Sequence, residues 1–562
     1  MASSTAEPRR ERLALLLAGP LLLLPALTSF LAHNAYGLTR PEALLAMALL
    51  AGAGLGASAV AVLGPRWLRP LVFAALLLLA IDLQTRWTAG LGTLGLLAVF
   101  AVLAALVWLL REHVGTLLCV VFGTLWLTSF FVPAVGLWAQ GPPTAKADAD
   151  AAADAALPTL LHVILDEHIG VEGIPAEFDP GHRLANALQE ALVGRGFSVF
   201  GRAYSRHYDT TLSVPSVLNF QSGEGASLTA PVGAGHRLTA NAWLERMHER
   251  GYRTHVLESD FLALCEAGGA QRADSCSTYN LESADSIEDA ALAVSEKAHV
   301  LLASFARLSS LLQRVRAEYA GLRAGPVGAA LPLPDWPAGY ERISSLSAMR
   351  ALDAMEARLR AARPGEAFLV HVMLPHYPYT YDDQCRLEPD VGRWLYALAP
   401  EAAPRQNTAA TRRERYPLYL AQVACTQRRV GRLLDALEQA GVYERAIVVV
   451  HGDHGSRLDT GPPVAANAPT LTAADLIDGF STLFAAKLPG QPAVYDRRVL
   501  PLDLLVAHAV LDGAIPPGAD WAPAPSVFLS AAAGAPARAA LPSFAWGAAT
   551  DAVASEPHAL PR

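Results

Sequence analysis

The chain has 562 residues, 52% of them hydrophobic, and a formal net charge of −8. This negative balance, with no basic cluster beyond the arginines that flank the apolar runs, argues against a nucleic-acid partner. The length allows several domains, and apolar residues are concentrated in the first quarter of the chain. A membrane-spanning part followed by a separate folded domain is therefore predicted.

Five apolar runs lie in this first part, at about residues 13–31, 43–63, 68–81, 91–110 and 116–137. Most of them approach the ~20 residues that a helix needs to cross a bilayer. We predict an all-α transmembrane domain at residues 1–138 with about five helices. Four is the alternative count, because the third run is the shortest and ends at Asp82. A cleaved signal peptide would explain the first run only.

Arginines are distributed unequally between the two sides of these runs, and basic residues near a span tend to stay in the cytoplasm. The bias predicts a cytoplasmic amino terminus and, with five spans, an outer location for everything after Trp138. We expect a multi-pass protein of a bacterial cytoplasmic (inner) membrane whose folded domain faces the periplasm or the cell exterior. The richer side has Arg9, Arg10, Arg12, Arg66, Arg69 and Arg111, and the poorer side has Arg40 and Arg86.

Composition also sets the limits of the folded domain. Residues 139–156 are rich in Pro, Ala and Asp and lack apolar periodicity, which is typical of a linker. The folded extracytoplasmic domain is then expected at residues 157–542. The Ala- and Pro-rich residues 543–562 are expected to form a disordered tail.

The cysteines agree with an oxidising compartment. Cys119 lies in an apolar run and is interpreted as a small apolar residue. The other four lie on the predicted outer side, where two disulfides with three possible connectivities are allowed. We favour Cys265 with Cys276, which closes a short loop that contains glycine, and this leaves Cys385 with Cys425. Four reduced thiols in the core are the alternative.

The second part of the chain alternates two kinds of periodicity. Short apolar runs with β-branched residues predict strands, and longer stretches between them have helical periodicity. This alternation is typical of an α/β fold with a mostly parallel sheet covered by helices on both faces. The strands are expected at about residues 160–165, 254–257, 368–374, 446–450 and 482–486, and helices at 344–362 and 416–440.

Polar residues with metal-binding side chains follow three of these strands. Asp166 and Glu167 follow the first strand, His376 follows the third, and Asp453 and His454 follow the fourth. Sites in such folds gather at the carboxyl ends of the strands. The pattern therefore predicts one divalent cation held between the tips of two strands.

A group of hydroxyl residues lies between these strands, at residues 205–219. Thr210 begins a short helical pattern there, and a helix amino terminus together with a nearby cation would favour its alkoxide form. Threonine is also an ordinary helix-capping residue, so a cap is the alternative interpretation. His207 could line the same pocket or could be a solvated loop histidine.

The ordered set Asp166, Thr210 to Pro215, Pro375-His376-x-Pro378 and Asp453-His454-Gly455 resembles the sulfatase-like branch of the alkaline phosphatase superfamily. With five amino-terminal spans and an outer domain, the architecture looks like that of phosphoethanolamine transferases and lipoteichoic acid synthases. The resemblance implies an alkaline-phosphatase-like α/β/α sandwich after the transmembrane domain.

Carried over residue by residue, the resemblance implies a role for each member of the set. Asp166, Asp453 and His454 match the family's metal ligands, Thr210 matches the nucleophile that also touches the metal, and His376 matches the histidine at the transferred group. One divalent ion is implied. Mixed carboxylate and imidazole ligation favours zinc or manganese, with magnesium or calcium as further possibilities.

Two features depart from the transferase pattern. Glu167 beside Asp166 resembles the paired acids of sulfatases, whereas these transferases usually have a single acid. The transferases also have another histidine shortly after Asp-His-Gly, and residues 456–476 contain none. Arg457 is the nearest cationic residue and could hold an anionic oxygen or be a solvated loop arginine.

Sulfatases of the main type oxidise a Cys or Ser within a Cys/Ser-x-Pro-x-Arg motif, which the sequence around Thr210 lacks. Phosphoryl chemistry is therefore favoured. We predict transfer of a phospho-linked headgroup, of the phosphoethanolamine or phosphoglycerol type, from a phospholipid donor to an envelope glycan or lipid acceptor through a Thr210 intermediate. A phosphodiesterase or sulfuric-ester hydrolase of the same superfamily is one alternative, and a non-enzymatic envelope protein is another.

Overall fold

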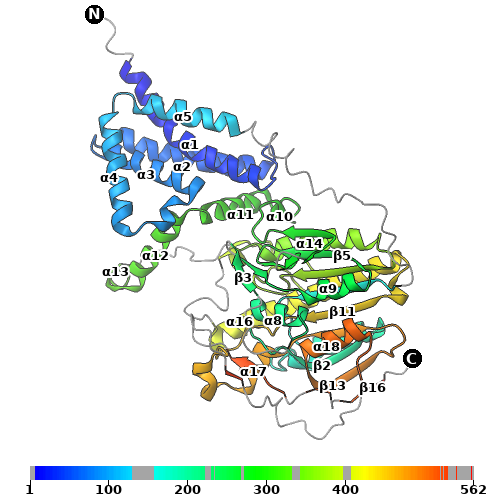
Figure 1. The fold of residues 1–562 in the computed structure, drawn as a ribbon. Coiled ribbons are helices and arrows are strands. Elements are labelled where there is room, and N and C mark those ends of the chain that lie inside the picture. The colour runs from blue at the N-terminus through cyan, green and yellow to red at the C-terminus, as the bar shows by residue number, and fades with distance from the viewer. Residues whose placement is uncertain are drawn as a thin grey trace, which may run out of the picture. The chain divides into compact units, whose positions relative to one another are not determined.

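A computed structural model describes residues 7–129, 157–221, 229–232, 235–267, 271–331, 342–396, 407–518, 521–522, 525–529, 539–540 and 558–559. The chain forms two compact units (Figure 1). Unit 1 comprises residues 1–146, 282–342 and 389–397, and unit 2 comprises residues 147–281, 343–388 and 398–562. The expected linker at 139–156 lies outside the described residues, as does the expected tail apart from residues 558–559.

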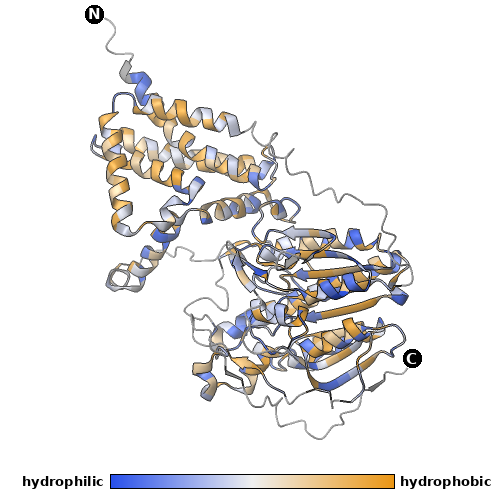
Figure 2. Ribbon diagram, viewed as in Figure 1, coloured by the Kyte–Doolittle hydropathy of each residue, from blue (hydrophilic) through white to orange (hydrophobic). Residues whose placement is uncertain are grey.

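Unit 1 begins with five apolar helices, one at each predicted apolar run, and Figure 2 shows their hydrophobic composition. Three of them are long and apolar enough to cross a membrane, and the last two could count as a fourth span, as one pair bent by 115°. These helices make the chain a membrane protein, and the number of crossings stays a prediction. The helices are α1 (Glu7–His33), α2 (Pro41–Leu63), α3 (Leu68–Thr85), α4 (Thr93–Leu109) and α5 (Val114–Ser129).

Helix α5 runs alongside α1 in the same direction. At its start the Gly115 amide donates to Glu11 Oε1 (2.6 Å), and at its end Ser129 Oγ lies 2.7 Å from Thr28 Oγ1. Helix α4 therefore carries the chain from the end of unit 1 where α3 stops to the end where α1 begins.

Unit 1 also contains helices from the middle of the sequence, within the stretch that sequence analysis assigned to the domain at residues 157–542. Helix α11 packs against α2, and the Ala284 amide donates to Asn34 Oδ1 in the loop after α1. The helices are α10 (Asp285–Glu288), α11 (Val294–Arg307), α12 (Ser310–Ala324), α13 (Pro326–Ala330) and the short α15 (Gly392–Leu395).

Unit 2 is built on a nine-stranded sheet with the order β16-β13-β2-β12-β11-β1-β10-β5-β9. The five strands from β11 to β9 are parallel, whereas β12 is antiparallel to both of its neighbours. The mostly parallel sheet of the predicted fold class is confirmed. Its strands are β1 (Leu160–Leu165), β2 (Ser198–Tyr204), β5 (Arg253–Ser259), β9 (Ser275–Tyr279), β10 (Glu366–Val372), β11 (Ile447–Gly452), β12 (Phe484–Lys487), β13 (Val494–Pro501) and β16 (His558–Ala559).

Helices cover both faces of this sheet. Leu160 and Ile164 of β1 share a buried apolar core with α8 (Thr210–Leu218), α9 (Ala242–Glu249) and α18 (Leu502–Ala507). Leu161 and Val163 point to the opposite face because strand side chains alternate, and they are fully buried as well. The second layer consists of α7 (Arg183–Gly194), α14 (Ser344–Leu359) and α16 (Ala409–Gln439), which pack against one another and against strands of the sheet.

Smaller elements lie outside these layers. Three short sheets pair β3 (Thr229–Val232), β4 (Gly235–Leu238) and β6 (Leu262–Ala263); β7 (Glu266–Ala267) and β8 (Gln271–Arg272); and β14 (Phe528–Leu529) and β15 (Ala539–Ala540). Helix α17 (Ala473–Phe480) follows the loop after β11.

The end of β11 tolerates no side chain at its glycine. A Cβ on Gly452 would lie 2.3 Å from the carbonyl oxygen of His168, so Gly452→Ala should destabilise unit 2 by about 2 kcal/mol or more. Gly431 in the interior of α16 has open space around it, and Gly431→Ala should stabilise the protein by up to ~1 kcal/mol. Thermal unfolding of the full-length variants followed by circular dichroism compares them, and equal shifts would contradict this packing.

Candidate metal centre

Three parallel strands end at the same level and deliver the polar side chains of the site. Leu165 at the end of β1 pairs with Val372 of β10 on one side and with Gly452 of β11 on the other. The next residues, Asp166 and Asp453, are therefore neighbours at the carboxyl edge of the sheet. Both are fully buried, so the sheet fixes two carboxylates side by side away from water.

The backbone around Asp453 holds its carboxylate in place. Asp453 Oδ1 accepts hydrogen bonds from the amides of Glu167 (3.0 Å) and His454 (2.8 Å). The hydroxyl of Ser213 on α8 donates to the Asp453 carbonyl oxygen. The strand tip and the helix that carries the hydroxyl group are thereby fixed to each other.

Thr210 is the first residue of α8, and the cap of this helix is its neighbour. The Asp209 side chain accepts from the Thr211 amide at 2.8 Å, so the interpretation of Thr210 as the helix cap is wrong. The Thr210 hydroxyl is left to face the carboxylates: Oγ1 donates to Asp166 Oδ2 at 3.2 Å and lies 3.2 Å from His454 Nε2. This hydroxyl sits at the positive end of a helix and inside the ligand cluster.

His454 presents a nitrogen lone pair to the site. Its Nδ1 donates to the Gly455 carbonyl oxygen (3.0 Å), which leaves Nε2 unprotonated and directed toward Asp453 Oδ2 at 3.2 Å. Burial lowers the pKa of His454 below its ordinary value, so the imidazole is neutral near pH 7. A neutral imidazole held in one tautomer is ready to bind a metal.

Burial of the Asp166 and Asp453 carboxylates requires more compensating positive charge than the described residues around them supply. Burial and the neighbouring Asp166 raise the pKa of Asp453, whereas the pKa of Asp166 is lowered because nearby histidines, His371 among them, outweigh the effect of its burial. Among the described residues, Asp166 Oδ1 and Asp453 Oδ2 are buried without a hydrogen-bond partner. Ligand atoms of Asp166, Asp453 and His454 lie within 4.8 Å of one another, so the donor set fits a divalent cation.

A second group of potential ligands shares Asp166. Ligand atoms of Asp166, Glu167 and His376 also lie within 4.8 Å of one another, with His376 Nε2 3.6 Å from Glu167 Oε1. Glu167 is fully buried and has a φ of 61°, a conformation that non-glycine residues rarely adopt. The backbone strain directs the Glu167 carboxylate into the site.

The segment that carries His376 is held by one glutamine of α16. Gln422 is fully buried, and its Nε2 donates to the carbonyl oxygens of Pro375 (3.1 Å), His376 (3.0 Å) and Pro378 (3.1 Å). Its Oε1 accepts from the Thr380 amide at 2.8 Å. One side chain therefore replaces the secondary structure that this segment lacks.

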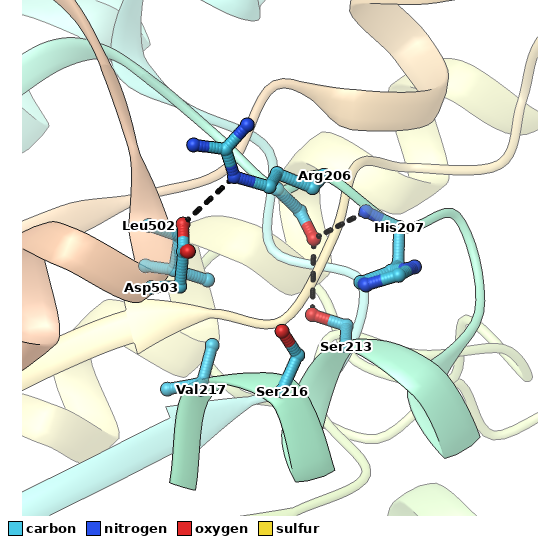
Figure 3. Close-up of a pocket in the computed structure, with 8 residues that line it drawn as sticks. Arg206, His207, Ser213, Ser216, Val217, Leu502 and Asp503 are labelled. Atoms are coloured by element: carbon cyan, nitrogen blue, oxygen red, sulfur yellow. Dashed lines mark hydrogen bonds and ion pairs between the residues drawn. The ribbon is translucent and has the colours of Figure 1, made fainter. Parts of the chain in front are cut away.

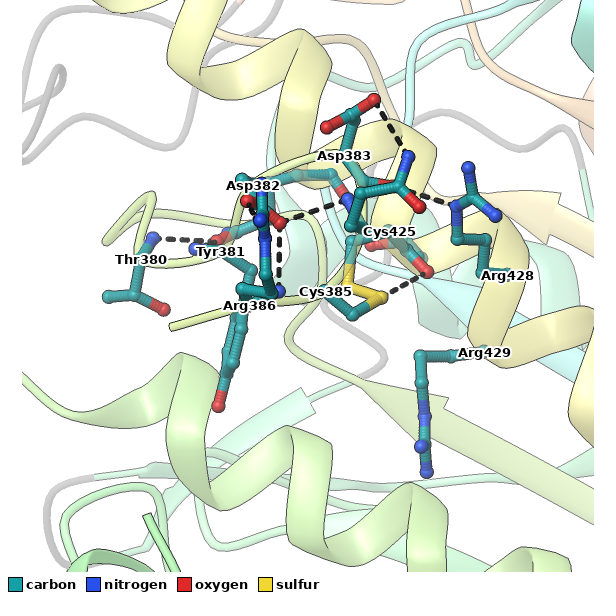
Figure 4. The surroundings of a disulfide bond; sticks show 12 residues. Thr380, Tyr381, Asp382, Asp383, Cys385, Arg386, Cys425, Arg428 and Arg429 are labelled. Atoms are coloured by element: carbon teal, nitrogen blue, oxygen red, sulfur yellow. Dashed lines mark hydrogen bonds and ion pairs between the residues drawn. A yellow bond between two sulfur atoms is a disulfide. The ribbon is translucent and has the colours of Figure 1, made fainter. Parts of the chain in front are cut away.

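A disulfide ties the same segment to α16 further along. Cys385 and Cys425 form a disulfide with a Cα–Cα distance of 4.9 Å (Figure 4). Cys265 and Cys276 form the second one, so both predicted pairings are confirmed and the reduced-thiol alternative is wrong. Cys425 lies one turn after Gln422, and the covalent and hydrogen-bonded attachments of the His376 segment are adjacent on one helix.

Sequence analysis missed a histidine of the site. His371 lies within β10, is fully buried, and its Nε2 is 3.5 Å from Asp166 Oδ2. A histidine inside an apolar strand is ordinarily a core residue. The signal that could have identified His371 as a site residue was its position one residue before the end of a strand that pairs with β1.

Arg457 lies beside the site rather than in solvent. Its Nε is 3.8 Å from Glu167 Oε1, its Nη2 is 3.6 Å from Asp209 Oδ2, and its guanidinium lies 5.2 Å from the ring centre of Tyr208. The interpretation of Arg457 as a solvated loop residue is wrong. It places a permanent positive charge next to the helix start that carries Thr210.

His207 is not brought into the ligand cluster. Its ring stacks on Phe528 with centroids 5.0 Å apart, and it lines a small cavity beside α8 (Figure 3). The same cavity is bordered by the buried ion pair of Arg206 and Asp503 at 3.2 Å. The alternative of a solvated histidine is also wrong, because His207 is buried.

Potential metal ligands and a buried threonine hydroxyl therefore meet at the carboxyl edge of an α/β sheet. Residues 178–475, more than half of the chain, match the family Sulfatase. The chain belongs to the sulfatase family, within the alkaline phosphatase superfamily, and is an enzyme of that superfamily. This membership favours an enzyme over the non-enzymatic alternative.

Solved structures give remote matches. The C-terminal periplasmic domain of EcEptC from Escherichia coli is 14% identical, with 70% of this chain and 94% of that chain covered and a TM-score of 0.39. The phosphonate monoester hydrolase SpPMH from Silicibacter pomeroyi is 14% identical, with coverages of 66% and 79% and a TM-score of 0.39. The putative sulfatase yidJ from Bacteroides fragilis is 13% identical, with coverages of 63% and 73% and a TM-score of 0.34.

These three likenesses are too remote to assign a reaction or a substrate to this chain. Among curated protein sequences, none matches it.

Loss of one carboxylate should weaken metal binding. Purified full-length Asp453→Asn should lose at least about tenfold in metal affinity, measured by metal analysis after dialysis against a weak chelator. Asp496→Asn is the matched control, because Asp496 is equally buried but pairs with Arg498 on β13. Undiminished metal content in the Asp453 variant would refute the assignment of this ligand.

Proposed function

We propose that the protein transfers a phospho-linked headgroup from a membrane phospholipid to an envelope acceptor through a covalent Thr210 intermediate. The observation that carries the proposal is the Thr210 hydroxyl, 3.2 Å from both Asp166 Oδ2 and His454 Nε2. A hydroxyl in that position has no evident structural task, because Asp209 already caps the helix. Its burial among metal-binding groups is what a nucleophile requires.

Each residue of the site has a separate role in the proposed reaction. A zinc or manganese ion bound by Asp166, Asp453 and His454 would stabilise negative charge on the phosphoryl oxygens and favour the Thr210 alkoxide. Arg457 lies near enough to the start of α8 to attract an anionic headgroup. His376, held by Gln422, faces the same cluster from the segment that follows β10.

The proposed reaction has two halves. In the first, Thr210, whose proton has gone to water, bonds to phosphorus through Oγ1 while the bond from phosphorus to the diacylglycerol oxygen breaks, and protonated His376 gives that oxygen a proton from Nε2. In the second, an acceptor hydroxyl bonds to phosphorus, and the bond to Thr210 breaks so that Thr210 leaves as the alkoxide. The acceptor's proton returns to His376 Nε2, so the enzyme is regenerated.

The membrane unit supports a lipid donor. We propose that the five apolar helices α1 to α5 are five membrane crossings of a bacterial cytoplasmic membrane, with the amino terminus inside. The residue before α10 and the first turns of α12 contact the loops after α1 and α3, which form the arginine-poor side. That contact supports an outer location for the catalytic residues, where lipid headgroups and envelope acceptors are present.

Hydrolysis is the second candidate. It uses the same residues, with water in place of the acceptor hydroxyl, and the position of Glu167 beside Asp166 within a second ligand group favours it. Headgroup-labelled lipid incubated with and without candidate acceptors distinguishes the two, because only a transferase converts the label into an acceptor adduct.

Removal of the nucleophile tests the mechanism directly. Thr210→Ala should lower turnover of a phosphodiester by on the order of 10³-fold or more, and Thr210→Ser should restore part of it. Thr211→Ala removes the neighbouring hydroxyl, which is bonded to Asp209, and should retain most activity. Mass spectrometry of the wild-type protein should find the transferred group on the peptide that contains Thr210. An unchanged rate in Thr210→Ala would show that the nucleophile is another group.

The glutamine that holds the His376 segment gives a further test. Gln422→Leu should lower turnover by roughly 10- to 100-fold through displacement of His376, with metal content unchanged. Gln427→Leu is the control, because it removes a polar contact with His168 from the same helix. Equal turnover in both variants would mean that the position of His376 does not matter for the reaction.

A further inference from the structure

Helix α12 has an exposed apolar face that nothing in the described part of unit 1 covers. Val315 is 45% exposed and Leu322 is 53% exposed. The two are seven residues apart, which places them on the same side of a helix, two turns from each other. Exposed apolar residues in line are unusual on a helix that faces only water.

The start of α12 is fixed at the end of a membrane-spanning helix. The buried carboxylate of Asp82, near the end of α3, accepts from the hydroxyls of Ser309 and Ser310 at 2.6 Å each and from the Leu311 amide at 2.9 Å. These bonds satisfy amide and hydroxyl donors in the first turn of α12. The depth of α12 along the unit is therefore set by the end of α3.

The residues next to this contact are those of a bilayer surface. Trp87, in the loop after α3, is 52% exposed, and tryptophan is enriched where hydrocarbon meets the headgroups. Arg314 on the first turns of α12 donates to the Ala89 carbonyl oxygen in the same loop. Helix α12 thus starts at the level of an interfacial tryptophan.

The charges of α12 fit a negatively charged surface. The helix has three arginines, Arg314, Arg316 and Arg323, and one acidic residue, Glu318. On a helical projection Arg316 and Arg323 lie along one border of the apolar face. An apolar face bordered by long basic side chains is the pattern of helices that lie in the plane of a membrane and bind anionic lipids.

We propose that α12 lies in the membrane–water interface on the outer side of the cytoplasmic membrane. Val315 and Leu322 then lie in the headgroup–acyl boundary, and Arg316 and Arg323 contact the phosphates of anionic phospholipids. This contact is made by a segment inserted in the sequence between β9 and α14, after the amino-terminal helices. It is independent of the reaction that the catalytic residues perform.

Site-directed labelling of the full-length protein in nanodiscs tests the proposal. An environment-sensitive fluorophore is attached through Val315→Cys, Leu322→Cys or Ala317→Cys, each with Cys119→Ala to remove the free cysteine. Ala317 is exposed and lies two residues from Val315, on the other side of the helix, so it is the matched control. Nanodiscs with one copy each exclude contacts between copies.

Labels at 315 and 322 should be quenched at least about twofold more by lipids carrying a spin label than the label at 317, and aqueous iodide should give the reverse order. Equal iodide quenching at all three positions would overturn the proposal. Protection of 315 and 322 from both quenchers would overturn it too, because it would mean that protein covers the face.

A separate measurement tests the contact between the two arginines and anionic lipid phosphates. Lipid quenching at 322 should be greater in phosphatidylglycerol than in phosphatidylcholine nanodiscs, and Arg316→Gln combined with Arg323→Gln should remove this difference. Quenching that does not depend on lipid charge in the unsubstituted protein would refute the phosphate contact.

Discussion

The site depends on two carboxylates that the sheet forces together. Register between β1 and β11 places Asp166 and Asp453 next to each other in the protein interior, where mutual repulsion and lost hydration both oppose ionisation. A bound cation would stabilise such a pair of carboxylates, and the neutral imidazole of His454 completes a donor set that fits a cation. The surrounding architecture, from the Ser213 contact to the strained backbone of Glu167, maintains that arrangement.

Candidate site residues outside the sheet need separate support, and α16 supplies much of it. Gln422 and Cys425 hold the His376 segment, while Tyr419 donates to the Glu167 carbonyl oxygen and accepts from the Ile169 amide. One long helix therefore positions segments that follow two different strands. The geometry of the site therefore depends on α16 as well as on the strands.

Features that depend on the local sequence pattern could be predicted from the sequence. Strand β1 was predicted at its observed bounds, and the acidic and histidine residues after β1 and β11 could be located because strand ends are followed directly by their site residues. His371 could not, because an interior strand histidine has the same local pattern whether it lies in a core or beside a carboxylate.

Other features depended on partners that local pattern does not reveal. The hydrogen bonds of Gln422 join residues more than forty positions apart, so they are not visible in the local sequence. The packing of helix α11 against α2 is of the same kind, because an apolar helix face does not identify its partner. The cap at Asp209 was missed because Thr210 is an equally acceptable capping residue.

The composition of unit 1 has a practical consequence for anyone who divides this protein. A fragment that begins at residue 157 would include α11 but not α2, and it would include the first turn of α12 without Asp82. The buried side of α11, with Val300 and Leu301, would then face water and promote aggregation. Proteolysis within residues 139–156 would likewise fail to release a soluble enzyme, because residues 282–342 remain part of unit 1.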